Sequence, residues 1–190
     1  RMILGINRPD KGSIKYCTKD FNKKVGVQLQ TTPFFEGFTV EENLKLFGTF
    51  YQCEMTNKVM QNILNKYNLI DVKNTLASKL SLGQQKRLAI GITTLHDPEF
   101  VILDEPSAGL DPEAQRNVQK LILQLKRRGK SVLFSSHDML EVRNIADRII
   151  IMDQGSLLES GEPESLLHKY DVFNLEELFY EVTKKERGYV

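Results

Sequence analysis

The chain contains 190 residues, of which 41% are hydrophobic and 27% are charged. This composition indicates one globular domain, with room for a small subdomain, and it excludes a disordered chain. Because 26 Lys and Arg residues are balanced by 25 Asp and Glu residues, the charge favours neither nucleic acid nor an anionic membrane surface as a partner. Cys17 and Cys53 follow no disulfide or metal-binding pattern, which indicates reduced thiols in a cytosolic protein.

The beginning of the chain predicts turns and short strands. Residues 1–6 have the pattern of the end of a helix rather than of a signal peptide or a natural start. Short strands are expected over residues 13–17 and 24–28. No apolar run is long enough to span a bilayer.

A helical region is predicted next, and its helices begin with clear capping signals. Thr39 and Glu42 form a reciprocal pair that satisfies free amides at a helix start. Ser81 and Gln84 form a second such pair. Between them, a further helix is expected over residues 56–67, because its apolar residues recur at helical spacing.

From Glu99 onward, strands alternate with helices, which predicts a parallel sheet covered by helices. Asp111 and the following proline predict the start of a long helix, and Gly129 predicts its end. Asp138 and Glu141 are expected to cap a later helix. The remaining elements expected are strands over 100–103, 131–135 and 148–153, a hairpin back into 156–159, and helices near 164–168 and 175–182.

Two carboxylates follow the most apolar of these strands. Asp104 and Glu105 stand at its carboxyl end, where open α/β sheets bind their ligands. Asp104 suits Mg²⁺, which prefers oxygen ligands, and Glu105 suits the activation of an attacking water. The alternative is that residues 104–106 form only a polar exit from the strand.

Three other polar positions are candidates for phosphate chemistry, each with a structural alternative. The helix start at Ser81–Gln84 suits a phosphate, because its free amides are positive and Gly83 allows close approach, although a capping box alone explains the same residues. His137 follows the next strand and could contact a γ-phosphate, or it could be a structural hydrogen-bonding group. Gln30 could touch metal and water, or it could be a solvated surface amide.

These residues occur in one order along the chain: Gln30, Ser81–Gln84, Asp104–Glu105, Ser107–Asp111 and His137. In this order the chain resembles the nucleotide-binding subunit of an ABC transporter over essentially its whole length. The resemblance implies an α/β P-loop NTPase core with a parallel sheet and helices, plus an inserted helical subdomain. It also implies that the ligands are ATP and Mg²⁺.

The resemblance also assigns roles to the candidate residues. Glu105 would be the general base and His137 the switch histidine, which makes these two the catalytic residues. Asp104 and Gln30 would hold the metal. The residues implied to contact nucleotide are Gln30, Ser81, Gly83, Gln84 and Asp111, with Ser81–Gln84 as the signature that reaches the opposite subunit's γ-phosphate.

Four segments are expected from the same resemblance. Residues 1–35 would be the remaining core up to the glutamine loop, and residues 36–97 the helical signature subdomain. Residues 98–161 would return to the ATPase core, and residues 162–190 would form the C-terminal helices. The details Val27–Gln30 and Leu175–Phe179 look most like the drug- and antibiotic-export class.

Two features depart from the family pattern. Leu82 replaces the first of two signature glycines, which we expect to be a tolerated variation. The phosphate loop G-x-x-x-x-G-K-[S/T] is absent from the printed sequence, because Gly129-Lys130-Ser131 is preceded by Gln124 where the first glycine should stand. We therefore expect a fragment that lacks the N-terminal strands and is inactive alone. The lost strand is expected beside the Asp104 strand, and its loss is expected to promote self-association.

The expected partners are a transmembrane permease subunit and a second ATPase subunit in a head-to-tail dimer, with no nucleic acid. The expected location is the cytoplasm, peripheral on the inner face of the cell membrane. The alternative class is an ABC-type ATPase that acts on ribosomes or chromosomes. The segment between Gln30 and Ser81 is too short for the coiled coil of chromosome-type members, and the chain has one cassette where ribosome-type members have two. A degenerate, inactive fragment is the third possibility.

Overall fold

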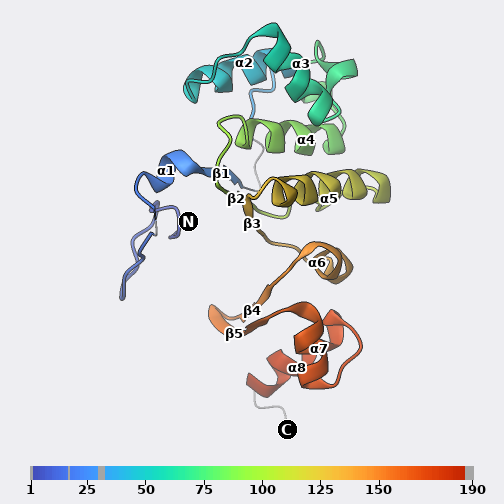
Figure 1. Cartoon of the computed structure of the whole chain (residues 1–190). Coiled ribbons are helices and arrows are strands. Elements are labelled where there is room, and N and C mark those ends of the chain that lie inside the picture. The colour runs from blue at the N-terminus through green and yellow to red at the C-terminus, as the bar shows by residue number, and fades with distance from the viewer. Residues whose placement is uncertain (1, 17, 30–32, 187–190) are drawn as a thin grey trace. The chain divides into compact units, whose positions relative to one another are not determined.

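The computed structural model describes residues 2–16, 18–29 and 33–186. The chain divides into two compact units, Arg1–Ser135 and Ser136–Val190. The first unit contains the parallel sheet and most helices, and the second contains a hairpin and the last helices (Figure 1).

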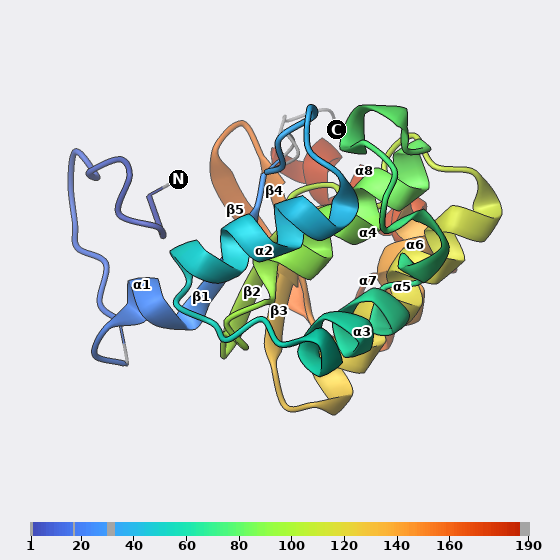
Figure 2. The same ribbon diagram turned by 90° about the horizontal axis from the view of Figure 1, so that it is seen from above.

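The first unit is built around three parallel strands that lie side by side (Figure 2). The strands are β1 (Val25–Gln28), β2 (Phe100–Leu103) and β3 (Ser131–Phe134), in the order β1-β2-β3. In register, Val25 lies opposite Phe100, and Phe100 lies opposite Ser131. The three carboxyl ends therefore meet at one edge, where the candidate residues were expected.

The central position of β2 corrects one prediction. A strand was expected beside the Asp104 strand, yet β1 and β3 already occupy the two edges of β2. A strand has only two hydrogen-bonding edges, so no further strand can pair there. Among the described residues, β3 has a partner strand on one edge only.

The helices of the first unit begin and end close to their predicted positions. Thr39 and Glu42 form the expected capping box of α2, and Ser81 and Gln84 form that of α4. Asp111 caps α5 through its side chain, with Pro112 in the first turn. The helices are α1 (Phe21–Lys24), α2 (Val40–Phe50), α3 (Asn57–Lys66), α4 (Leu82–Thr93) and α5 (Pro112–Arg127), with 3₁₀ turns at Ile70–Val72 and Ala77–Lys79.

Helix α4 packs closely on the sheet and supplies much of the core. A side chain at Gly26 in β1 would place its Cβ 2.3 Å from the Thr93 carbonyl oxygen, so glycine permits this approach. The His96 ring, just after α4, lies 3.1 Å from the Val25 carbonyl oxygen. The buried apolar residues of these layers include Leu88, Ile90 and Ile92 from α4, Val101 and Leu103 from β2, and Val118 and Ile122 from α5.

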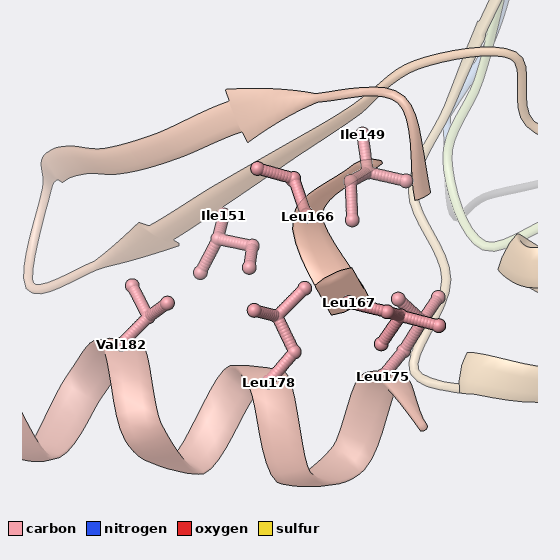
Figure 3. Packing of buried hydrophobic residues seen from close by; sticks show 7 residues of the cluster. All are labelled: Ile149, Ile151, Leu166, Leu167, Leu175, Leu178 and Val182. Carbon is pink, nitrogen blue, oxygen red and sulfur yellow. The ribbon is translucent and has the colours of Figure 1, made fainter. Parts of the chain in front are cut away.

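The second unit pairs an antiparallel hairpin with helices. Strands β4 (Ile149–Asp153) and β5 (Ser156–Gly161) confirm the predicted hairpin, with a turn at Gln154 and Gly155. The helices are α6 (Met139–Ile145), α7 (Pro163–Tyr170) and α8 (Leu175–Glu186). One apolar cluster joins β4, α7 and α8 (Figure 3), and it consists of Ile149, Ile151, Leu166, Leu167, Leu175, Leu178 and Val182.

Two predictions near the beginning of the chain are wrong. Residues 2–6 form turns and a bend rather than the end of a helix, and residues 13–16 form no strand. Their exposed apolar side chains, among them Ile3, Ile6 and Ile14, are not packed in a core. Without burial of an apolar face, neither short segment can offset the entropy of ordering its backbone.

No helix within residues 2–16, 18–29 and 33–186 is both long enough and apolar enough to cross a lipid bilayer.

Lys66, at the end of α3, makes stability depend on pH. Burial, together with repulsion from Arg128, lowers the pKa of Lys66 to about 8. The unfolded chain therefore binds more protons between pH 8 and 10.5, so folding becomes more favourable as pH rises through this window.

Lys66→Met should remove this dependence. After allowance for solvent screening, we expect the variant to gain about 1 kcal/mol of stability near pH 7 and little above pH 10.5. Urea unfolding at several pH values measures the difference, with Lys58→Met on the exposed face of α3 as the control. An equal gain at all pH values would contradict the assignment to Lys66.

Candidate nucleotide-phosphate site

At Asp104 and Glu105, the two residues with predicted functional carboxylates, the chain leaves the central strand through an unusual turn. The Asp104 amide donates to the Gln28 carbonyl oxygen at 2.9 Å, which extends the pairing of β1 with β2 by one residue. Glu105 then has φ of 47°, a left-handed conformation that non-glycine residues rarely adopt. The chain turns here, away from the direction of β2.

Ser135, just after β3, joins both carboxylate residues. Its hydroxyl donates to Asp104 Oδ1 at 2.6 Å and accepts from the Glu105 amide at 2.9 Å. A further bond, from the Ser135 amide to the Leu103 carbonyl oxygen at 3.0 Å, continues the pairing of β2 with β3. Ser135 thereby fixes the Asp104 carboxylate and the Glu105 peptide at the same edge of the sheet.

The side chain of Lys86, from the second turn of helix α4, also contacts the chain at Glu105. Only 7% of Lys86 is exposed, and its Nζ lies 3.2 Å from the Glu105 carbonyl oxygen. Burial lowers the pKa of Lys86, while the carboxylates of Glu105 and Asp104 raise it. A buried ammonium needs such partners, because an unpaired one would lose its charge.

The predicted capping box at the start of α4 is confirmed, while phosphate binding there stays a prediction. Ser81 Oγ accepts from the Gln84 amide at 3.3 Å, and Gln84 Oε1 accepts from the Ser81 amide at 2.9 Å. A Cβ at Gly83 would lie 2.9 Å from Ala114 Cβ, so glycine lets α4 approach the start of α5. The positive end of α4 retains further backbone amides that could bind an anion.

The segment between β2 and α5 lies beside this helix start. Leu82, the residue that departs from the family pattern, extends to 3.4 Å from the position of a Cβ on Gly109. Asp111 Oδ1 accepts from the amides of Glu113 and Ala114 at 3.0 and 2.9 Å. Leu82 therefore lies against the segment Ser107–Asp111, and the carboxylate of Asp111 caps α5.

The predicted site residues fall into three groups. The first unit holds Asp104, Glu105 and Asp111, together with the start of α4 that carries the signature residues. His137 belongs to the second unit, in the segment between β3 and α6. Gln30 lies outside the described residues. The convergence of Gln30, Glu105 and His137 on one triphosphate therefore stays a prediction.

Sequence reasoning missed two residues of this site. Ser135 could have been found, because it ends a predicted strand of the parallel sheet, and the carboxyl ends of such strands are where ligands bind. Lys86 gave no signal, since a lysine in a helix is usually solvated and only tertiary packing buries this one.

A parallel sheet with paired acids at its carboxyl edge and a capped helix start beside it is an arrangement typical of α/β domains that bind ligands at the carboxyl ends of their strands. A model of the family described as ABC transporter matches residues 1–108. The chain belongs to the ABC transporter family.

Several curated relatives are similar to this chain, all of them ATP-binding proteins named for Nod factor export. Nod factor export ATP-binding protein I of Burkholderia lata is 30% identical over 176 residues, which cover 88% of this chain and 58% of the relative. The Paraburkholderia xenovorans protein is 31% identical with the same coverage. The Bradyrhizobium diazoefficiens protein is 29% identical over 188 residues, covering 94% and 61%. The chain thus spans about three fifths of the length of these relatives.

Solved structures show the same fold. The ATP binding subunit of an ABC transporter superposes with a TM-score of 0.81 at 22% identity, covering 96% of this chain and 80% of that one. The cbiO1 protein of Clostridium perfringens, part of the ABC transporter complex cbiONQ, gives 0.75 at 24% identity, covering 89% and 73%. The predicted fold class, a P-loop NTPase core of the ABC ATPase type, is confirmed.

Proposed function

We propose that the chain is the catalytic and signature-bearing part of an ATP-hydrolysing subunit that powers an ABC export transporter. The observation that carries the proposal is the Asp104–Glu105 pair at the carboxyl end of β2, fixed by the hydroxyl of Ser135. In this role Glu105 accepts a proton from water as the water oxygen bonds to the γ-phosphorus. The bond from that phosphorus to the bridging oxygen breaks, leaving ADP and phosphate.

The residues at the site fit Mg²⁺ together with a nucleotide. Asp104 offers a carboxylate whose orientation is already set by Ser135. Mg²⁺ needs only one or two protein carboxylates when phosphate oxygens and waters complete its shell. When bound, the metal ion would neutralise charge on the phosphates. We assign Asp104, and Gln30 from the family resemblance, as its protein ligands.

We propose that the start of α4 contacts a second ATPase subunit in a head-to-tail dimer. Ser81, Gly83 and Gln84 would contact the nucleotide that the second subunit holds. His137 would contact the nucleotide bound by its own subunit. The reciprocal cap between Ser81 and Gln84 supports this role, because a phosphate can replace the cap as acceptor for the helix amides.

An aromatic surface on the first unit is the proposed contact with a transmembrane permease. Phe35, Phe38 and Phe50 are 49%, 42% and 62% exposed, and Phe35 and Phe50 both contact the Phe47 ring. Exposed clustered aromatics of this kind favour a protein partner. Docking there would place the subunit on the inner face of the membrane. The export roles named for the relatives support export as the direction.

Two measurements test this function. Isothermal titration of the chain alone is expected to show no Mg-ATP binding in the micromolar range, because the printed sequence contains no phosphate loop. A chimera should restore binding and turnover. In it, the part of the Paraburkholderia xenovorans relative that precedes the matched region is joined to residue 1 of this chain.

A chimera that binds Mg-ATP but hydrolyses none would contradict the proposed function, since Asp104 and Glu105 would then lack a catalytic role. Micromolar binding by the chain alone would contradict the expectation that ATP binding requires the phosphate loop.

A further inference from the structure

We propose that Lys86 and Ser135 are positioning residues that hold the Glu105 peptide in its left-handed conformation and so aim its carboxylate. We call this arrangement the Glu105 clamp. Its two side chains come from different places in the chain, α4 and the residue just after β3. The inference rests on the proposed function for its catalytic consequence, but the clamp itself is a feature of the described structure.

The conformation of Glu105 needs support from its surroundings. At φ of 47° a residue with a Cβ is strained, and the cost is typically about 1 kcal/mol or more. Pro106 follows directly, and the proline ring restricts the backbone of the residue before it. Such a conformation persists only where neighbouring groups bind it firmly.

Both polar groups of the Glu105 backbone are bound by side chains. Its amide donates to Ser135 Oγ at 2.9 Å, and its carbonyl oxygen accepts from Lys86 Nζ at 3.2 Å. The Ala108 amide is a second donor to the same carbonyl oxygen, at 3.3 Å. Rotation of Glu105 out of the left-handed region would break the bonds at both ends of the residue.

The donor at Lys86 is strong because it is buried and charged. Only 7% of Lys86 is exposed, so its charge–carbonyl bond is poorly screened by water. Loss of the Nζ would remove the charged donor from the Glu105 carbonyl oxygen and keep the longer bond from the Ala108 amide.

The position of Lys86 gives the clamp a consequence beyond local stability. Lys86 lies in the second turn of α4, the helix whose capped start is Ser81–Gln84. A displacement of this helix would therefore move the donor that holds Glu105. Within one subunit, Lys86 therefore connects α4, whose start carries the signature residues, to the turn at Glu105.

Amide hydrogen exchange of the chain, followed by NMR, tests the clamp directly. Ser135→Ala and Lys86→Met should each accelerate exchange of the Glu105 and Ala108 amides about tenfold, because each removes one of the anchoring bonds. Ser135→Thr keeps the hydroxyl and Lys86→Arg keeps a charged donor. Both variants should therefore retain most of the protection of these two amides.

The controls separate the clamp from general destabilisation. Ser136→Ala removes a hydroxyl that instead donates to Glu141, and Lys45→Met removes a lysine that pairs with Glu41. Both should leave the Glu105 amide at its original rate. Unchanged exchange in Ser135→Ala and Lys86→Met, or equal acceleration at Val101 within β2, would contradict the clamp.

Turnover by the chimera tests the catalytic consequence. Lys86→Met should lower kcat at least about tenfold and leave KM for ATP unchanged, since the donor acts on the base rather than on the nucleotide. Accelerated exchange with unchanged kcat would overturn the positioning role. Absence of turnover in the chimera without substitutions refutes the proposed function instead, and the exchange rates alone then decide whether the clamp exists.

Discussion

Glu105→Gln in the chimera is expected to lower kcat for ATP hydrolysis by about 10²–10⁴, with the Kd for Mg-ATP changed little. Glutamine preserves the size of the side chain but cannot accept the proton of the attacking water, and general-base catalysis contributes a factor of this size. The measurement is phosphate release at saturating Mg-ATP, together with isothermal titration of the same variant.

A matched substitution controls for the loss of a carboxylate. Glu99 lies just before β2, and its carboxylate pairs with Lys24 at 2.9 Å on the exposed surface. Glu99→Gln should therefore leave turnover close to its original value. Equal effects of the two substitutions would show that Glu105 has no special role.

Leu178→Ala is expected to destabilise the second unit by about 2–5 kcal/mol, which exceeds the effect of most single substitutions. Leu178 is fully buried at 0% exposure, and its side chain points from α8 toward the other members of the apolar cluster (Figure 3). The unit contains few buried apolar residues, so a cavity there weakens the whole cluster. Urea unfolding and exchange of the β4 amides measure the loss.

Tyr180→Ala on the same helix is the control, because this side chain is 62% exposed. We expect a change within about 0.5 kcal/mol for Tyr180→Ala. If Leu178→Ala caused no larger change than Tyr180→Ala, α8 would not pack as the structure shows.

Local signals predicted most of the secondary structure. The capping pairs at Thr39 and Ser81 gave the starts of α2 and α4, and Asp111 gave that of α5. These signals act within one helical turn, so the sequence contains them completely. The short strand expected over residues 13–17 failed within its described part, because residues 13–16 pair with no described strand and Ile14 stays exposed.

The arrangement of the site depends on contacts that local patterns do not contain. Asp104 and Glu105 could be identified as candidate site residues, because they directly follow a predicted apolar strand. The burial of Lys86, the left-handed φ of Glu105 and the central position of β2 all depend on which elements pack together. The expected four-segment organisation and the roles of Gln30 and His137 remain predictions that came from the family resemblance.

The most direct test of the central claim is an experimental structure of the chimera with Mg²⁺ and a non-hydrolysable ATP analogue. We predict that Asp104 binds the metal ion, that Glu105 faces the γ-phosphate, and that Gln30 and His137 approach the same phosphate. A structure in which Glu105 and His137 face separate surfaces, with the analogue bound elsewhere, would contradict the claim that these residues form one ATP-hydrolysing site.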